Sequence, residues 1–131
     1  MPLALQIIEK SYPNDFIAQA EYNMEYGKLL RVQKKKTEAI LILKSAKELL
    51  EKNNYTENTL FTSILWQLSI VYRGLRNEGE SYLRYARNHT ENARKILEKI
   101  GMKRSLDYAN ILQEFGKIHR YTEEHSKSID Y

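Results

Sequence analysis

The chain has 131 residues, of which 42% are hydrophobic, and a formal net charge of +4 with a sequence pI of about 9.2. It has no cysteine, which excludes a disulfide framework, a thiolate metal site and a cysteine nucleophile. Five glycines and two prolines are too few for a turn-rich β protein or a glycine-rich phosphate loop. The composition therefore favours a soluble helical protein.

Apolar residues recur at helical spacing along the chain, and no stretch keeps the strict alternation of a strand. Pro13, Asn53-Asn54, Gly79-Glu80 and Gly101-Met102 interrupt this spacing. The connections are short, so consecutive helices should be antiparallel neighbours. The pattern predicts an all-α protein of about six helices, over residues 3–11, 15–32, 37–52, 57–75, 80–100 and 105–121.

Alternate helices share a motif: a large residue, then a small residue, then an arginine four positions after the small one. It reads Tyr26-Gly27 with Arg31, Leu68-Ser69 with Arg73, and Phe115-Gly116 with Arg120, at separations of 42 and 47 residues. Small residues at such points let paired helices approach closely. A helix pair that repeats along the chain is therefore predicted.

The partner helices follow the same pattern, with one ambiguity. Ala39 and Ala46 follow Gly27, and Ala86 and Ala93 keep the same spacing in the next pair. That second pair carries about five extra residues before Ala86. An alternative register therefore places Ser81, Tyr85 and Asn88 at the crossing.

Helix pairs of this length, with small residues at the crossing, resemble the tetratricopeptide repeat (TPR) family, and most closely its long-repeat, kinesin-light-chain-like branch. Leu65-x2-Leu68-Ser69-x2-Tyr72 and Ala39-x3-Leu43 carry the resemblance, although Trp66 stands away from the family's usual tryptophan. The resemblance implies one domain over residues 1–131, folded as a right-handed α-α superhelix of antiparallel helix pairs. The alternative is an ordinary helical bundle.

The repeats implied by this resemblance span approximately residues 14–53, 56–100 and 103–131, and the last is incomplete. Residues 1–13 resemble the end of a preceding helix, and residues 126–131 the beginning of a following one. We therefore expect a fragment of a longer array, with possible self-association through exposed solenoid ends.

Catalytic and metal-binding motifs are not evident. His119 and Glu123 share a helix face, but no second ligand pair accompanies them. No nucleotide-binding or nucleophile-elbow motif occurs. We therefore expect a protein that is not an enzyme and has no cofactor or metal. The run Lys34-Lys35-Lys36 is interpreted as a solvated turn, with phosphate or acidic-lipid contact as the alternative.

The motif helices also carry the candidate binding residues. On each helix they stand three positions before the small residue, one position after it and four positions after it, which places each set on one helix face. In the family this face lines a concave groove, so the resemblance implies a groove here lined by Met24, Lys28, Arg31, Trp66, Ile70, Arg73, Gln113, Lys117 and Arg120.

Five of these nine side chains are cationic, which favours carboxylates or phosphates. The alternative is that the arginines pair with Glu25 and Glu114. We expect a cytoplasmic protein-interaction scaffold or ligand-sensing module, with no membrane span, whose partner is an acidic protein or peptide. The alternative function is nucleic-acid binding, for which Trp66 and Tyr121 are the candidate stacking residues.

Overall fold

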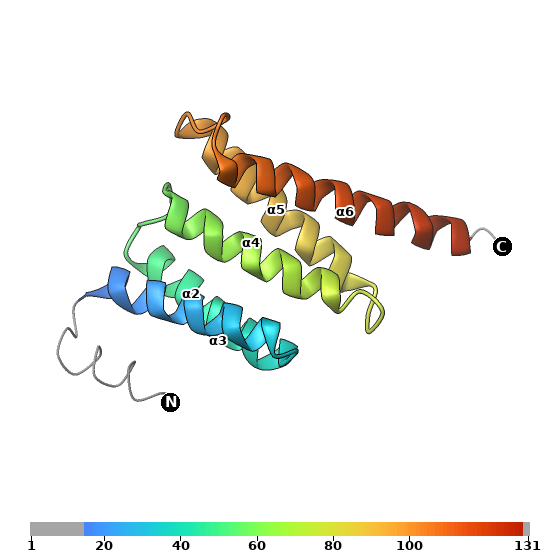
Figure 1. The fold of residues 1–131 in the computed structure, drawn as a ribbon, viewed down its shortest axis with the longest axis horizontal. Helices are drawn as coiled ribbons and strands as arrows, with labels where there is room; N and C mark the ends of the chain where they lie inside the picture. The colour runs from blue at the N-terminus through green and yellow to red at the C-terminus, as the bar shows by residue number, and fades with distance from the viewer. Residues whose placement is uncertain (1–14, 130–131) are drawn as a thin grey trace. The chain divides into compact units, whose positions relative to one another are not determined.

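The structure is a computed structural model that describes residues 15–129, with side chains described for residues 15–124. All regular secondary structure in this range is helical, which confirms the predicted all-α class. The chain divides into two compact units, residues 1–56 and 57–131, and each is described by itself (Figure 1). The predicted helix over residues 3–11 lies outside the described residues.

The first unit contains α2 (Phe16–Val32) and α3 (Lys36–Lys52), packed against each other. Asp15 begins α2 by accepting a 3.0 Å hydrogen bond from the backbone N–H of Ala18. Each helix turns one apolar stripe toward the other, and the buried residues are Ala20, Gly27 and Leu30 on α2 and Ala39, Leu43, Ala46 and Leu50 on α3.

The turn between α2 and α3 is set by Lys34, which has a positive φ of 65°. The backbone N–H of Lys35 donates to the carbonyl of Leu30, and that of Lys34 to the carbonyl of Arg31. These two bonds satisfy carbonyls at the helix end and make a Schellman cap. Lys34 and Lys35 are exposed, as a solvated turn requires.

The second unit contains α4 (Thr59–Gly74), α5 (Ser81–Lys99) and α6 (Leu106–Ile129). Asn58 caps α4, since its side chain accepts a 2.9 Å bond from the backbone N–H of Phe61. Helix α5 packs against both α4 and α6, and α6 also contacts α4. The core of the unit is apolar, with Ile64, Leu65, Leu68 and Val71 from α4, Ala86, Ala93 and Leu97 from α5, and Ile111 and Ile118 from α6.

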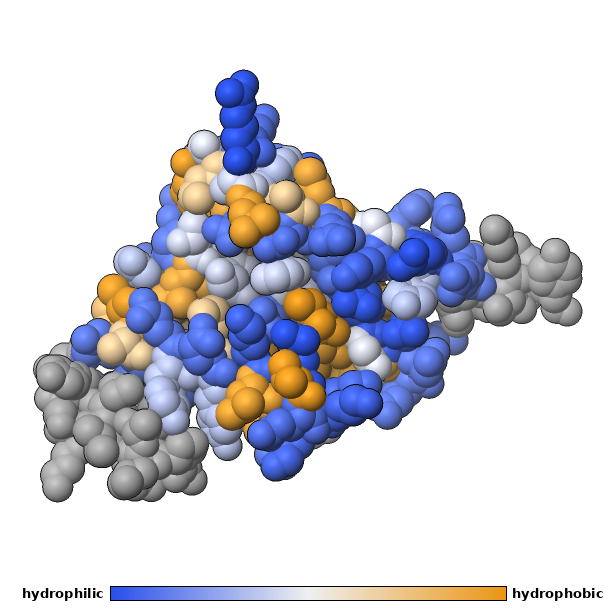
Figure 2. Space-filling model, viewed as in Figure 1, coloured by the Kyte–Doolittle hydropathy of each residue, from blue (hydrophilic) through white to orange (hydrophobic). Residues whose placement is uncertain are grey.

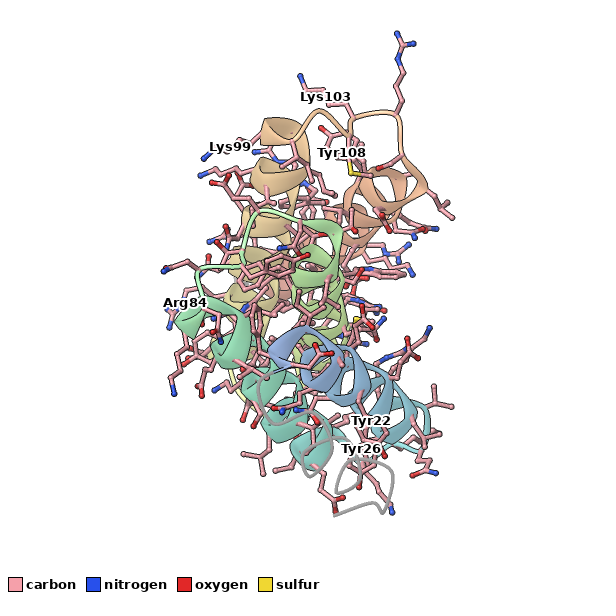
Figure 3. All side chains as sticks on the ribbon, turned by 90° about the vertical axis from the view of Figure 1, so that its left-hand side faces the viewer. Tyr22, Tyr26, Arg84, Lys99, Lys103 and Tyr108 are labelled. Atoms are coloured by element: carbon pink, nitrogen blue, oxygen red, sulfur yellow. The ribbon has the colours of Figure 1, made fainter. Side chains whose placement is uncertain are left out.

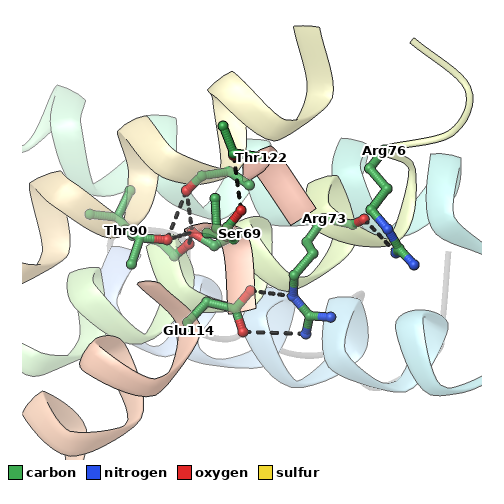
Figure 4. A network of polar contacts seen from close by, with 9 residues as sticks. Ser69, Arg73, Arg76, Thr90, Glu114 and Thr122 are labelled. Atoms are coloured by element: carbon green, nitrogen blue, oxygen red, sulfur yellow. Dashed lines mark hydrogen bonds and ion pairs between the residues drawn. The ribbon is translucent and has the colours of Figure 1, made fainter. Parts of the chain in front are cut away.

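The two helix pairs cross at equivalent positions with different chemistry. In the first unit Gly27 lets α3 approach so closely that a Cβ there would lie 2.6 Å from Cγ of Leu43. In the second unit Ser69 replaces the glycine, and Thr90 replaces the leucine. Both hydroxyls are buried, and they are joined by a 2.8 Å hydrogen bond (Figure 4). The carbonyl of Ala86 accepts from the same pair of hydroxyls.

This crossing resolves the register of the second pair. Ala86, Thr90, Ala93 and Leu97 are buried, as their equivalents Ala39, Leu43, Ala46 and Leu50 are in the first pair. Tyr85 and Asn88 are exposed, so the alternative register through Ser81, Tyr85 and Asn88 is wrong. Most of the extra residues lie in the connection between α4 and α5, and the others lengthen the start of α5.

Two expectations about the last helix are corrected. Helix α6 continues to Ile129, so residues 126–129 do not begin a further helix. The physical reason is that no proline or glycine interrupts the chain after Gly116, so the backbone hydrogen bonding continues. Gly116 itself does not mark a helix crossing in the described residues, because a Cβ there would meet nothing within 4 Å.

Candidate functional site

The nine predicted groove residues fall in both units. Met24, Lys28 and Arg31 lie on α2 of the first unit, where Lys28 is exposed and the other two are half-buried. The remaining six belong to the second unit, with Trp66, Ile70 and Arg73 on α4 and Gln113, Lys117 and Arg120 on α6. The structure therefore places six of the nine residues on two helices of one unit.

Arg73 joins α4 to α6 through an ion pair with Glu114. Its Nε lies 2.5 Å from Oε2 of Glu114, and a terminal nitrogen lies 3.3 Å from Oε1 (Figure 4). The Glu114 side chain is only 2% exposed and that of Arg73 is 18% exposed. Arg73 is thus paired as the alternative interpretation proposed, and it is not a free cation of a groove.

The ion pair defines the surface between the two helices, which we call the α4–α6 face. Trp66 and Ile70 precede Arg73 at helical spacing on α4, and both are half-buried. Lys117 follows Glu114 by one helical turn on α6. An indole and an aliphatic side chain therefore share this face with charged groups.

A second link between α4 and α6 was not predicted. The guanidinium carbon of Arg76 lies 3.7 Å from the ring centroid of Tyr121, and Nη1 of Arg76 donates a 3.1 Å bond to the carbonyl of Arg73. The guanidinium carbon of Arg120 lies 5.7 Å from the centroid of the same ring. Since Arg73 contacts Glu114 and Arg76 contacts Tyr121, the two helices run parallel. The signal for Arg76 was its place one turn after Arg73.

Two cations remain available on the α4–α6 face. Among the described residues, neither Lys117 nor Arg120 has an acidic partner within ion-pair distance. The guanidinium of Arg76 also has no such partner, and stacking on Tyr121 leaves its remaining N–H groups able to donate. These cations follow the Arg73–Glu114 pair along the two helices, whereas Trp66 and Ile70 precede it.

A pocket of about 370 Å³ opens at the connection between α4 and α5. Its lining combines one cation with two carboxylates and contains Arg76, Asn77, Glu78, Gly79, Glu80 and Leu83. Because its charges are mixed, the pocket does not select strongly for an anion.

Several aromatic side chains pack around Tyr72 in the second unit. Its ring centroid lies 5.5 Å from that of Tyr85, 6.1 Å from that of Tyr82 and 5.4 Å from that of His89. On α2, Tyr22 and Tyr26 are neighbours with centroids 6.4 Å apart (Figure 3). Tyr121 is half-buried and covered by Arg76, so it does not offer a free ring for stacking on a base.

Helix α5 is tied to α6 by a carboxylate cluster. The hydroxyl of Tyr108 donates a 2.6 Å bond to Glu98, and Arg94 bonds Glu98 at 3.3 Å and also pairs with Glu91. The Tyr108 bond, aided by Arg94, holds the pKa of Glu98 below its usual range. The same bond raises the pKa of the Tyr108 phenol.

Other chemistry-bearing groups of the described residues do not form a site. His119 Nε2 lies 3.1 Å from Glu123 on an exposed stretch of α6. In the described part of the chain no group of three or more His, Asp or Glu side chains is placed to hold a metal ion. None of the described helices is long and apolar enough to cross a membrane.

Figure 2 shows that hydrophilic residues dominate the surface facing the viewer and that apolar residues form small patches on it.

No protein-family model matches this chain, and it matches no curated protein and no solved structure.

Proposed function

We propose that the chain is a non-enzymatic protein-interaction module of tetratricopeptide-repeat type, and that its α4–α6 face binds an acidic peptide or partner segment. The observation that carries the proposal is that Lys117 and Arg120 of α6 have no ion-pair partner among the described residues, on the unit whose α4 carries the half-buried Trp66 and Ile70. In an extended partner segment, carboxylates would be held by the cations, and an apolar side chain farther along the segment would pack on the indole.

The ion pair beneath this face supports a rigid binding surface. Glu114 neutralises Arg73 and joins the two helices, so the partner does not have to order them. A preorganised surface loses less conformational entropy on binding. Lys28 and Arg31 of α2 have the same spacing as Lys117 and Arg120 of α6, and we include them in the proposal as a second pair of cations.

The helix-pair repeat supports the assignment to the tetratricopeptide class. Two successive pairs bury the same four positions of their second helices, although one crossing uses glycine and leucine and the other uses hydrogen-bonded hydroxyls. Stacking of such pairs into a superhelix is part of the proposal. Nucleic-acid binding is less favoured, because Arg76 covers the ring of Tyr121.

The test is a binding measurement on a double charge reversal. Fluorescence anisotropy with acidic peptides should show binding to the wild-type chain that weakens as salt rises, because exposed ion pairs are screened. Lys117→Glu with Arg120→Glu should weaken binding at least about tenfold, since two attractive charges become repulsive.

The matched control is Lys44→Glu with Arg87→Glu, which changes charge equally at exposed positions away from this face. It should bind like the wild type. Equal losses in both variants would show that net charge alone is responsible. Tighter binding to generic RNA or DNA than to any peptide would favour the nucleic-acid alternative.

A further inference from the structure

The outward face of α6 has the residues of a helix-packing surface and no helix on it among the described residues. Ala109 of α6 is equivalent to Ala20 of α2 and Thr62 of α4, which are both buried, yet Ala109 is exposed. Leu112 is equivalent to Leu65, which is fully buried, yet Leu112 is 46% exposed. Leu106 precedes them at 77% exposure.

Among the α6 side chains that the structure describes, up to residue 124, the exposed large apolar ones are Leu106 and Leu112, both in the first half of the helix. Beyond Leu112 the same side of the helix carries Gly116, His119 and Glu123, and the last two are exposed polar residues. The surface therefore suits a short apolar segment covering Leu106 to Leu112.

The chain contains such a segment, and its sequence aligns with the ends of α3 and α5, the second helices of the two described pairs. Residues 46–52 read Ala-Lys-Glu-Leu-Leu-Glu-Lys, residues 93–99 read Ala-Arg-Lys-Ile-Leu-Glu-Lys, and residues 4–10 read Ala-Leu-Gln-Ile-Ile-Glu-Lys. The separations are again 42 and 47 residues. The shared alanine and the fifth residue of the block are fully buried in both described copies, as Ala46 with Leu50 and Ala93 with Leu97.

The block ends the second helix of each described pair. Because paired helices run antiparallel, that end lies against the beginning of the first helix of the pair. The beginning of α6 is the part that exposes Leu106, Ala109 and Leu112. Residues 4–10 thus match the uncovered surface in both length and register.

We propose that residues 3–11 of one chain dock on the Leu106–Leu112 surface of a second copy, making a head-to-tail contact. A second copy is the occupant because residues 3–11 are joined to α2 by a short connection. Helix α5, which is the described equivalent of this segment, packs between two helices. One is α6, which follows it in the chain, and the other is α4. Residues 3–11 would lie between their own α2 and the α6 of the neighbour. Such a contact is heterologous and can extend into longer assemblies.

The test is sedimentation equilibrium on the full chain, over a concentration series reaching about 1 mM. The wild type should show a mass that rises with concentration. Ile8→Asp on the segment, and Leu112→Asp or Leu106→Asp on α6, should each weaken association at least about tenfold, with the same helical circular dichroism. Leu41→Asp, at an exposed leucine of α3 outside the proposed contact, should not change it.

The decisive experiment mixes the segment variant with the α6 variant. An Ile8→Asp chain keeps its α6 surface and a Leu112→Asp chain keeps its segment, so the mixture should form a one-to-one heterodimer that neither variant forms alone. A wild type that stays monomeric throughout the series, or a mixture that gives no heterodimer, would overturn the proposal. A monomeric wild type in which both variants lower the melting temperature equally would place the segment on its own chain and would also overturn it.

Discussion

Glu114 and Arg73 form a two-point ion pair that fastens α6 to α4. The carboxylate is buried, whereas the guanidinium still reaches solvent at one edge. Removing the arginine and removing the glutamate should therefore lower the free energy of unfolding by different amounts.

Arg73→Ala should lower the free energy of unfolding by about 3–5 kcal/mol, because it leaves a buried carboxylate without its partner. Glu114→Ala should cost less, because Arg73 can turn toward water. Combining the two should cost less than the sum of the single changes. Urea unfolding measures all three, and equal losses for the two single variants would contradict this description of the pair.

A matched pair of glycine substitutions tests the helix crossing. Gly27→Ala should destabilise the chain by about 1–3 kcal/mol, because the new methyl group would overlap Leu43. Gly116→Ala should stabilise it by up to about 1 kcal/mol, because α6 has open space there and alanine favours the helix. Thermal unfolding of both variants gives the signs, and a loss at Gly116 would indicate a contact that the described residues do not show.

The helices could be predicted from the sequence because their boundaries are local. Asp15 and Asn58 cap their helices within one turn, and apolar spacing shows which side is buried. The contacts of the candidate site were harder to predict from the sequence. The spacing of the motif placed Arg73 on the correct face, but whether it meets Glu114 or a ligand depends on two helices far apart in the sequence.

Contacts made by loop and helix-end residues could not be predicted from the sequence. Arg76 lies in the connection after α4, one turn beyond Arg73, and that spacing does not indicate that it stacks on Tyr121. The bond between Ser69 and Thr90 was also missed, because the extra residues between Ser69 and Ala86 left the register of the second pair ambiguous.

The left-handed conformation of Lys34 provides a third test. A lysine with positive φ is strained by its Cβ, so Lys34→Gly should raise the free energy of unfolding by up to about 1 kcal/mol. Lys35 has a φ of −89°, and Lys35→Gly should instead lower it through the entropy of the unfolded chain. Chemical denaturation of the two variants should therefore give opposite signs, and the same sign in both would contradict the turn.

The bond from Tyr108 to Glu98 predicts a pH dependence. The pKa of Glu98 is lower in the folded chain than in the unfolded one, so ionised Glu98 contributes stability above its unfolded pKa. That contribution is lost as pH falls through the lowered folded value. The phenol behaves oppositely, since its raised pKa contributes stability that is lost as pH rises through the folded value.

Tyr108→Phe should move the pKa of Glu98 upward toward its usual range. The difference in stability between the variant and the wild type should shrink in acid. Carbon-13 NMR titration of the Glu98 carboxyl group measures the first effect directly. An unchanged pKa in the variant would show that the hydrogen bond does not cause the shift.

The most direct measurement of the proposed function is NMR mapping of an acidic peptide on the isotope-labelled chain. The proposal predicts shift changes at the Trp66 indole and at Ile70, Lys117 and Arg120, with smaller changes at the control positions Lys44 and Arg87. Changes confined to the Lys34-Lys35-Lys36 turn, or no saturable change up to about 1 mM peptide, would contradict binding at the α4–α6 face.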